Sequence, residues 1–565
     1  MDDFEVLKTE VLIIGGGGAG ARAAIEARGQ GAEVLLVSKG PISNSGLTPL
    51  AYPSLQAAFG YSDPRDNPDV HYHDTIEIGR FLADQDLARA LTDEIIPRVH
   101  DLDQYGVKFK KTDDGRFFQV HHPGQSYPRN LFIDKGGFGL IHGLKREVKR
   151  HPEIKVMEDF CVSRLLMNQG EVVGAFGLNM PDGKFYALEA KATILACGGY
   201  EELWGNTDTA PDSTGDGVYL GYQAGADVID MEMALYYPAA FAWPEAVKGV
   251  LIQYETFLAP DKLDYRLVNK FDQEFLPPGP PPVRDTLMRL MFTEIEEGRG
   301  TEHNAVYIDP RPSSKTPEEI EKIIELLLTV PDRNLKSLGI DIRKDRLETV
   351  PSIHYCLGGV HINVRTESTV PGLYAAGENA SNVHGANRIS GNALAETQVF
   401  GRRAGLYASQ YAKTRKQPSF LVQEVKDDLA RWQAFQVKKK DGVRAHVLRK
   451  EMKAAMDRYL GPNRRQAGME KALDIILDLR RNGLPQVEAV PGRVFNADWR
   501  MAMEVAMTLD LAELVIRSAL FRRETRGHHF RPDCPEVMAE PRHTLVKREG
   551  QAIAVTYKPV RKLQA

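Results

Sequence analysis

The apolar pattern near the start of the chain predicts a strand, a helix and a second strand. "EVLIIG", residues 10–15, and "AEVLLVSK", residues 32–39, are continuous apolar runs typical of buried strands. Between them, "AGARAAIEARGQG" has small and apolar residues at helical spacing and ends at a glycine. Residues 9–38 therefore predict a βαβ unit and an α/β fold.

The pattern changes several times further along the chain. Residues 171–199 alternate like a sheet, with "PDGK" as a hairpin turn. Residues 226–345 combine proline clusters with helical runs such as "TPEEIEKIIELLLTV", and residues 350–410 return to glycine-rich turns and the short strand "GLYAAG". After residue 413 the chain is helical and charged. We predict one α/β domain in two parts (1–225 and 349–412), an inserted domain (226–348), and a C-terminal helical domain and tail (413–565).

Composition excludes several classes of protein. The chain has 565 residues and a net charge of −5, which gives no electrostatic case for binding nucleic acid. Its four cysteines are scattered without a CxxC pair, so we expect no disulfide framework and no zinc, iron–sulfur cluster or covalent haem held by this chain alone. The pair His121-His122 is assigned no metal. Reduced thiols indicate a cytoplasmic protein.

The N-terminal segment "MDDFEVLKTEVLIIGGGG" is acidic where a secretory signal is basic, and its apolar run breaks at glycine. No stretch approaches the ~18 apolar residues that a membrane span requires. We therefore expect any membrane association to be mediated by a partner.

"GGGGAG" supplies the GxGxxG spacing at Gly15, Gly17 and Gly20, directly between a predicted strand and a predicted helix. These glycines let the backbone approach a pyrophosphate at a helix N-terminus. The acidic residue that usually ends the second strand is absent, because Ser38-Lys39 stand there. The fingerprint therefore favours FAD over NAD.

Several further motifs lie at characteristic separations: "ATILACGGY", "DSTGDG", "PSIHYCLGG", "GLYAAGE", "HGANRISGNAL" and, near the C-terminus, "NADWRMAMEVAMTLDLAELVIRSALFRRE". With the glycine fingerprint, they resemble the FAD-dependent flavoprotein subunits of succinate dehydrogenase and fumarate reductase. L-aspartate oxidases share this plan, and the flavin subunit of adenylylsulfate reductase is a more distant relative. The resemblance implies a Rossmann-like FAD-binding domain interrupted by an α+β capping domain and followed by a helical domain.

The fingerprint and the resemblance together place a set of cofactor-binding residues. They are Gly15, Gly17, Gly18, Ala19, Gly20, Ser38, Lys39, Ser45, Gly46, Ala196, Gly198, Asp216, Glu378, Asn392 and Leu394. Many family members link FAD covalently to a histidine shortly after the second strand, where this chain has Ser45 or Gly46. We expect non-covalent FAD, with a lowered flavin potential that favours reduction of an acceptor.

The resemblance also places three catalytic residues. Arg388 falls on the family arginine that clamps a substrate carboxylate, for which a planar guanidinium is well suited. His354 falls on a histidine that hydrogen-bonds the same end of the substrate. Arg284 falls on the arginine that passes the proton, and an acid of very high pKa can still protonate a strongly basic carbanion.

The other end of the predicted pocket departs from the family. Tyr237 and Ala239 replace the histidine and threonine of a His-Pro-Thr triplet, and Tyr254-Glu255 is the nearest match to a Thr-Glu pair. A tyrosine offers a hydroxyl and a ring face but no charge. The acceptor is therefore fumarate held by different hydrogen bonds, an unsaturated monoacid, an aryl or longer-chain acrylate, or a thioester.

The resemblance implies an oxidoreductase that transfers hydride between FAD N5 and an activated C=C bond of a small carboxylic acid. The chain carries no cluster, haem or nicotinamide fingerprint for electron supply, and its C-terminal domain is the part that accompanies an iron–sulfur subunit in this family. An L-aspartate oxidase-like or an enoate or aryl-acrylate reductase activity is an alternative. A flavin electron-transfer or scaffold subunit without its own substrate is an alternative of another class.

Overall fold

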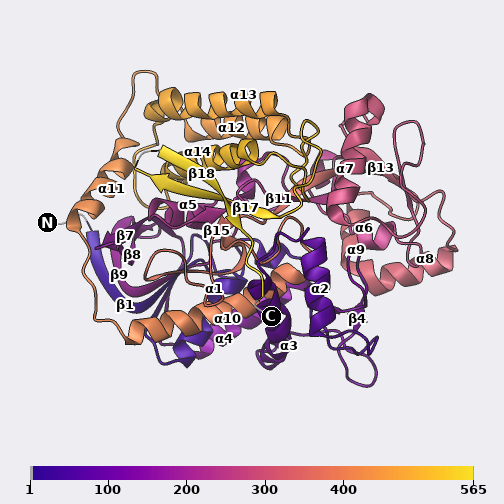
Figure 1. Ribbon diagram of the computed structural model, residues 1–565, viewed down its shortest axis with the longest axis horizontal. Coiled ribbons are helices and arrows are strands. Elements are labelled where there is room, and N and C mark those ends of the chain that lie inside the picture. The colour runs from indigo at the N-terminus through magenta and orange to yellow at the C-terminus, as the bar shows by residue number, and fades with distance from the viewer. Residues whose placement is uncertain (1–3, 551, 564–565) are drawn as a thin grey trace.

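The computed structural model describes residues 4–550 and 552–563, and a seven-stranded sheet organises its first part (Figure 1). The sheet order is β6-β2-β1-β9-β8-β7, with β16 paired to β9. Its strands are β1 (Phe4–Ile14), β2 (Val34–Val37), β6 (Ile154–Met157), β7 (Phe160–Asn168), β8 (Glu171–Asn179), β9 (Lys184–Leu195) and β16 (Leu373–Ala375). Strands β6, β2, β1, β9 and β16 are parallel, and β8 and β7 extend the sheet antiparallel. The predicted βαβ unit and hairpin are confirmed.

Helix α1 (Gly18–Gly29) follows β1 and packs against α10 (Asn392–Lys413). The chain thus returns to the first sheet after residue 370, as the glycine-rich segment indicates. Four further helices and a small sheet complete this region. They are α2 (Pro68–Ile78), α3 (Gln85–Gln104), α4 (Gly136–Arg150), α5 (Asp216–Gln223), and β3 (Ser54–Gln56), β5 (Asn130–Phe132) and β4 (Gln119–Val120).

A second hydrophobic core lies in the lobe at the right of Figure 1, and all its fully buried members fall between residues 237 and 347. Its sheet has the order β11-β14-β13-β12. The elements are β11 (Ala234–Phe241), β12 (Arg266–Val268), β13 (Val306–Asp309), β14 (Leu347–Cys356), α6 (Tyr254–Phe257), α7 (Arg284–Glu294), α8 (Pro317–Ile323) and α9 (Thr329–Ser337). Strand β14 pairs with β11 and β13, and its last residue, Cys356, accepts a hydrogen bond from Tyr200 in the segment after β9, so His354 lies close to the end of the first sheet. The predicted domain boundaries stay a prediction.

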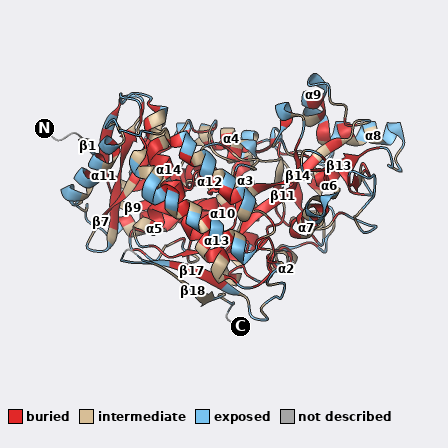
Figure 2. Ribbon diagram, turned by 90° about the horizontal axis from the view of Figure 1, so that it is seen from above, coloured by how far each residue is buried: buried red, intermediate tan, exposed pale blue. Residues whose placement is uncertain are grey.

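The last part of the chain contains α11 (Val422–Ala434), α12 (Ala445–Tyr459), α13 (Gln466–Asp478) and α14 (Ala497–Phe521). Most of α14 is buried beneath its neighbours (Figure 2). The chain then forms a hairpin of β17 (Arg542–Glu549) and β18 (Ala552–Pro559), which joins β10 (Val228–Ile229) and β15 (Gly359–Val360) in a four-stranded sheet. The sequence pattern predicts helices and a tail in this part of the chain and does not indicate the hairpin. Within the described residues, no helix has the length and apolar character needed to cross a membrane.

Candidate active site

Two adjoining cavities lie where the predicted motifs converge, and they share Leu47, Thr48, Glu378 and Thr397 in their walls. The first, which we call the dinucleotide cavity, is lined by the glycine turn after β1, the ends of β2 and β9, and the N-terminus of α5. The second, the substrate cavity, lies at the junction with the inserted lobe. A ligand that spans both cavities has one end against the glycine turn and the other beside the charged groups of the second cavity.

The dinucleotide cavity has the shape that a pyrophosphate requires. Gly15 has φ +113°, and a Cβ there would lie 2.1 Å from the Ala196 carbonyl oxygen. Gly17 is the N-cap of α1, and a Cβ there would meet only the Thr48 hydroxyl, at 3.5 Å. The N-terminus of α1 therefore faces the cavity, with the Gly18 N–H donating to the Thr48 hydroxyl at 3.0 Å. The residues present fit the diphosphate of FAD.

Lys39, at the end of β2, has its charge neutralised by the protein. Its ammonium lies 2.8 Å from the Asp216 carboxylate and 3.3 Å from Glu504 on α14. Burial works to lower the pKa of Lys39, but these two carboxylates outweigh it and raise the pKa above the usual range. Through the contact between Lys39 and Glu504, the C-terminal helices contact the wall of the dinucleotide cavity.

The substrate cavity contains Arg388, whose guanidinium is buried and has no carboxylate partner among the described residues. One Nη1–H donates to the Ile389 carbonyl at 3.3 Å, the ring of Tyr355 lies 4.6 Å away, and Nε has no partner. Burial and the nearby Arg284 charge lower the pKa of Arg388 to about 10. A buried cation in this state provides a strong site for an anion.

Arg284, the first residue of α7, lines the same cavity but already has an anionic partner. Its Nη2 lies 3.3 Å from Glu255 Oε1, and its Nη1 has no hydrogen-bond partner among the described residues. Burial works to lower the pKa of Arg284, but the Glu255 carboxylate outweighs it and raises that pKa. Tyr237 donates its hydroxyl to Glu255 Oε2 at 2.6 Å, and its ring lies 4.9 Å from the Arg284 guanidinium.

His354 reaches the cavity from β14 and is paired with Asp208, whose Oδ1 lies 2.9 Å from His354 Nδ1. Burial raises the pKa of Asp208 well above its usual range and lowers the pKa of His354 well below it. With both groups neutral, the Asp208 hydroxyl would donate to Nδ1 and the ring proton would lie on Nε2. This tautomer leaves an N–H donor for a substrate oxygen.

Most of the sequence-predicted residues lie in the walls of these cavities. Gly15, Gly17, Gly18, Ala19, Ser38, Lys39, Ser45, Gly46, Ala196, Gly198, Asp216 and Glu378 line the dinucleotide cavity. Arg284, His354, Arg388 and Leu394 line the substrate cavity.

Two predicted cofactor residues lie outside both cavity walls. Gly20 is a packing position, because a Cβ there would lie 1.8 Å from the Gly15 carbonyl oxygen. Asn392 instead joins two helices: its Oδ1 lies 2.8 Å from His71 Nε2, and its Nδ2 donates to the Thr75 hydroxyl at 3.1 Å.

Tyr237, Tyr254 and Glu255 were predicted to contact substrate, but they lie behind the cavity wall. The wall on this side is formed by Tyr52 and Leu251. The Tyr52 ring lies 6.3 Å from the Tyr237 ring, and its hydroxyl donates to the Leu251 carbonyl at 2.8 Å. Tyr237 and Glu255 therefore contact Arg284 from behind the wall.

Sequence reasoning missed Asp208, Tyr52 and Leu251. Asp208 stands between two recognised motifs, in "GNTDTAPDSTGDG", and an acidic residue so close to a cofactor motif is the only signal that could have found it. Tyr52 and Leu251 belong to no motif, and they meet only because the inserted lobe packs against the first domain.

The Asp208–His354 pair makes a testable prediction. Asp208→Ala should weaken binding of a substrate acid about two- to tenfold, because one neutral hydrogen bond is lost and the tautomer is no longer fixed. Asp208→Asn should restore most of the affinity, since an amide N–H can also donate to Nδ1. Equilibrium titrations of the three proteins check this, and equal affinity of Asp208→Ala and wild type would contradict it.

This glycine cradle and the adjoining cationic cavity define a flavin-dependent oxidoreductase. The profile described as "FAD binding domain" matches residues 10–394, and that described as "Fumarate reductase flavoprotein C-term" matches residues 449–564. The chain belongs to the family of flavoprotein subunits of fumarate reductase and succinate dehydrogenase, FAD-dependent oxidoreductases that act on CH–CH bonds.

Relatives and solved structures match along almost the whole chain. It is 37% identical to a fumarate reductase (CoM/CoB) subunit of Methanothermobacter marburgensis, over 98% of this chain and 100% of that protein. It is 30% identical to a fumarate reductase flavoprotein subunit of Mycobacterium tuberculosis, over 97% of each chain. The structure of Mycobacterium smegmatis Sdh1 in complex with UQ1 superposes with a TM-score of 0.89 at 31% identity, covering 99% of this chain and 95% of that one.

Proposed function

We propose that this chain reduces the activated C=C bond of a small carboxylic acid. The observation that carries the proposal is the convergence of Arg388, Arg284 and His354 on one cavity beside the dinucleotide cavity, with buried guanidinium nitrogens that lack partners. When bound, FAD would supply the hydride. Arg388 and His354 Nε2 hold the carboxylate of the substrate, so that its double bond faces the flavin.

Arg284 donates the proton to the substrate carbon that does not receive the hydride. Its unpartnered Nη1 is the N–H available to the cavity. Glu255 keeps the guanidinium in place, and its charge compensates that of Arg284 in the resting site. Glu255, Lys262 and His122 also line a smaller cavity. In this proposal, that cavity is the route by which Arg284 regains a proton.

The charges of the substrate cavity favour one carboxylate over two. Arg388 is its cation without a carboxylate partner, whereas Arg284 is already paired with Glu255. Leu50, Tyr52 and Leu251 add apolar surface. We therefore propose a monocarboxylic enoate, with an apolar or neutral group at its other end, as the preferred acceptor and fumarate as the alternative.

Equilibrium titrations test this choice. Fumarate, crotonate and cinnamate are added to the oxidised holoprotein, and binding is followed by the flavin absorption. A monocarboxylic enoate that binds more tightly than fumarate supports the apolar end of the cavity. Tighter binding of fumarate assigns a second carboxylate to that end, and failure of all three acids to bind would contradict the proposed function.

We also propose that FAD is held without a covalent bond. Ser45 and Gly46 line the dinucleotide cavity, and no histidine is among its lining residues. The Cys197 thiol in that wall has a pKa raised to about 12 by burial, which makes it a poor nucleophile. Acid precipitation should release all the flavin into the supernatant, and yellow colour retained by the washed pellet would contradict this.

Electrons reach FAD from a partner in this proposal. The relatives are named as subunits, and the C-terminal domain of this chain is of the kind that accompanies an iron–sulfur subunit. We therefore expect an iron–sulfur partner, with cytoplasmic placement and any membrane contact supplied by further subunits. Affinity purification from the native cell should recover a protein whose iron and sulfide are stoichiometric with flavin, and isolation of this chain alone, active with a soluble donor, would contradict it.

A further inference from the structure

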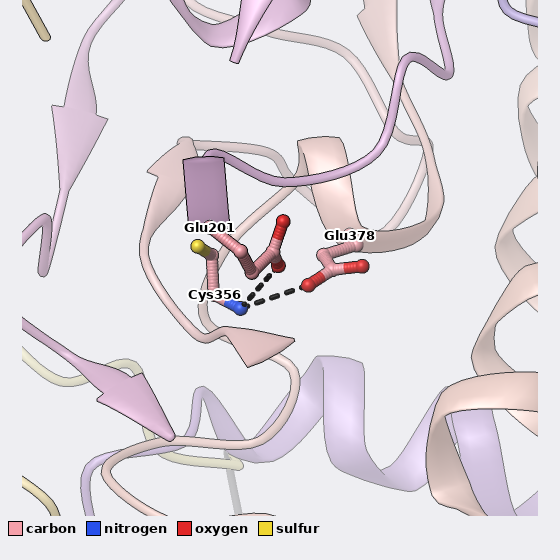
Figure 3. Close-up of side chains that lie close together, drawn as sticks. All are labelled: Glu201, Cys356 and Glu378. Carbon is pink, nitrogen blue, oxygen red and sulfur yellow. Dashed lines mark hydrogen bonds between the residues drawn. The ribbon is translucent and has the colours of Figure 1, made fainter. Parts of the chain in front are cut away.

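Two buried carboxyl groups lie close together beside the dinucleotide cavity (Figure 3). The proposed mechanism does not use them. Glu201 lies in the 3₁₀ turn Glu201–Leu203, and Glu378 in the 3₁₀ turn Gly377–Asn379. The backbone N–H of Cys356 donates to Oε1 of both, at 3.1 Å from Glu201 and 2.8 Å from Glu378. One donor therefore holds the two carboxyl oxygens together.

The pair is closely surrounded and has no counter-ion. A Cβ added at Gly199 would lie 2.4 Å from Glu201 Oε1 and 2.8 Å from Glu378 Oε1, so both oxygens are packed against backbone. Glu201 Oε2 is buried and has no hydrogen-bond partner within residues 4–550 and 552–563. In the described part of the chain, neither carboxyl forms an ion pair with lysine, arginine or histidine. Two adjacent carboxylates in such a setting cannot both be ionised.

We propose that Glu201 and Glu378 form an acid pair that holds one proton when FAD is oxidised and takes up a second when FAD is reduced. In the first state Glu378 is protonated and donates to the Glu201 carboxylate. In the second state Glu201 is protonated as well. A metal ion fits these groups less well, because the third candidate ligand is the Cys356 thiol, and burial raises the pKa of that thiol well above its usual range.

The neighbouring groups do not compete for this proton. The Tyr200, Tyr355 and Cys356 side chains are all protonated, because burial raises each of their pKa values. Burial, followed by the charge of Glu201, raises the pKa of Glu378 well above its usual range, although Arg388 acts in the opposite direction. Burial raises the pKa of Glu201 too, and the hydrogen bond from Glu378 opposes that rise. Burial also raises the pKa of Asp208 well above its usual range.

The position of Glu378 links the pair to the flavin. Glu378 lines both the dinucleotide and the substrate cavity, so it would lie beside a flavin held across the two. Two-electron reduction of a flavin near neutral pH adds one proton to the ring and leaves one negative charge there. A negative charge beside an ionised Glu201 is costly in a buried site. Protonation of Glu201 from solvent removes the carboxylate charge, so that two electrons and two protons enter together.

The test is the number of protons taken up per flavin, obtained from the pH dependence of the midpoint potential of the holoprotein between pH 6 and 9. Redox dyes deliver the electrons, so the result does not depend on which acid is the substrate. Wild type should take up two protons per two electrons. Glu201→Gln should take up one, because Glu378 alone stays protonated in its buried position.

Glu202→Gln is the matched control, because Glu202 lies in the same turn but is paired with Arg449 and Lys453. It should keep the wild-type proton count. An unchanged count in Glu201→Gln, or a count of one in wild type, would overturn the proposal.

Reduced-minus-oxidised infrared difference spectra of wild type provide a second measurement that needs no variant. A protonated-carboxyl band should appear on reduction, and its absence would overturn the proposal even if Glu201→Gln failed to fold.

Discussion

Replacement of Arg284 by lysine should lower the turnover of the enzyme by about 10²- to 10⁴-fold while FAD stays bound, the range typical for loss of a positioned proton donor. Lysine keeps a positive charge for Glu255, but it is shorter and lacks the planar fork that presents one nitrogen to Glu255 and another to the cavity. The measurement is steady-state turnover with an artificial electron donor, together with the flavin content of the purified protein.

Arg289→Lys is the matched control for this variant. Arg289 lies on the same helix, donates to the Asp285 carbonyl at 3.2 Å and is not among the residues that line the substrate cavity. Its replacement should change turnover by about twofold at most. Near-normal turnover of Arg284→Lys would show that another group donates the proton.

Replacement of Arg388 by glutamine should weaken binding of every carboxylic acid substrate by about ten- to a hundredfold, which corresponds to the roughly 1.5–3 kcal/mol of a hydrogen bond to a charged group. The stability of the ligand-free protein should not fall, because this guanidinium is buried with no carboxylate partner among the described residues. Acid titrations and thermal melting of the same samples give both quantities.

Arg388→Lys serves as the graded control, since it keeps the charge but loses the bidentate geometry. It should bind acids with an affinity between those of wild type and Arg388→Gln. Unchanged acid affinity in Arg388→Gln would place the carboxylate elsewhere in the cavity, whereas a large loss of stability would show that Arg388 has a structural role.

The dinucleotide cavity could be predicted from the sequence because its parts are local. Gly15 and Gly17 act through the turn in which they stand, and the strand before them and the helix after them are visible as patterns. The wall of the substrate cavity depends instead on how the inserted lobe packs. Tyr237 occupies the position that the resemblance assigns to substrate binding, yet Tyr52, from a distant segment, stands in the wall.

The buried acids Glu201 and Asp208 show a second limit of sequence reasoning. Glu201 and the side chain of Asp208 are buried, and both residues lie in the region after β9, where no periodicity separates a buried carboxyl group from an exposed one. Asp208 meets His354, and Glu201 meets Glu378, each more than 140 residues away in the chain. Only tertiary packing gives these acids their partners and perturbs their pKa values.

The most direct measurement of the central claim is a single turnover without any electron-transfer partner. The holoprotein is reduced anaerobically to bleach its flavin, and excess fumarate or crotonate is then added. The proposed function predicts that the yellow colour returns with at least one of these acids, and that one saturated acid forms for each flavin reoxidised. If the flavin stays reduced with both acids and with cinnamate, the chain is a flavin electron-transfer or scaffold subunit without a substrate of this class, and the proposed function is wrong.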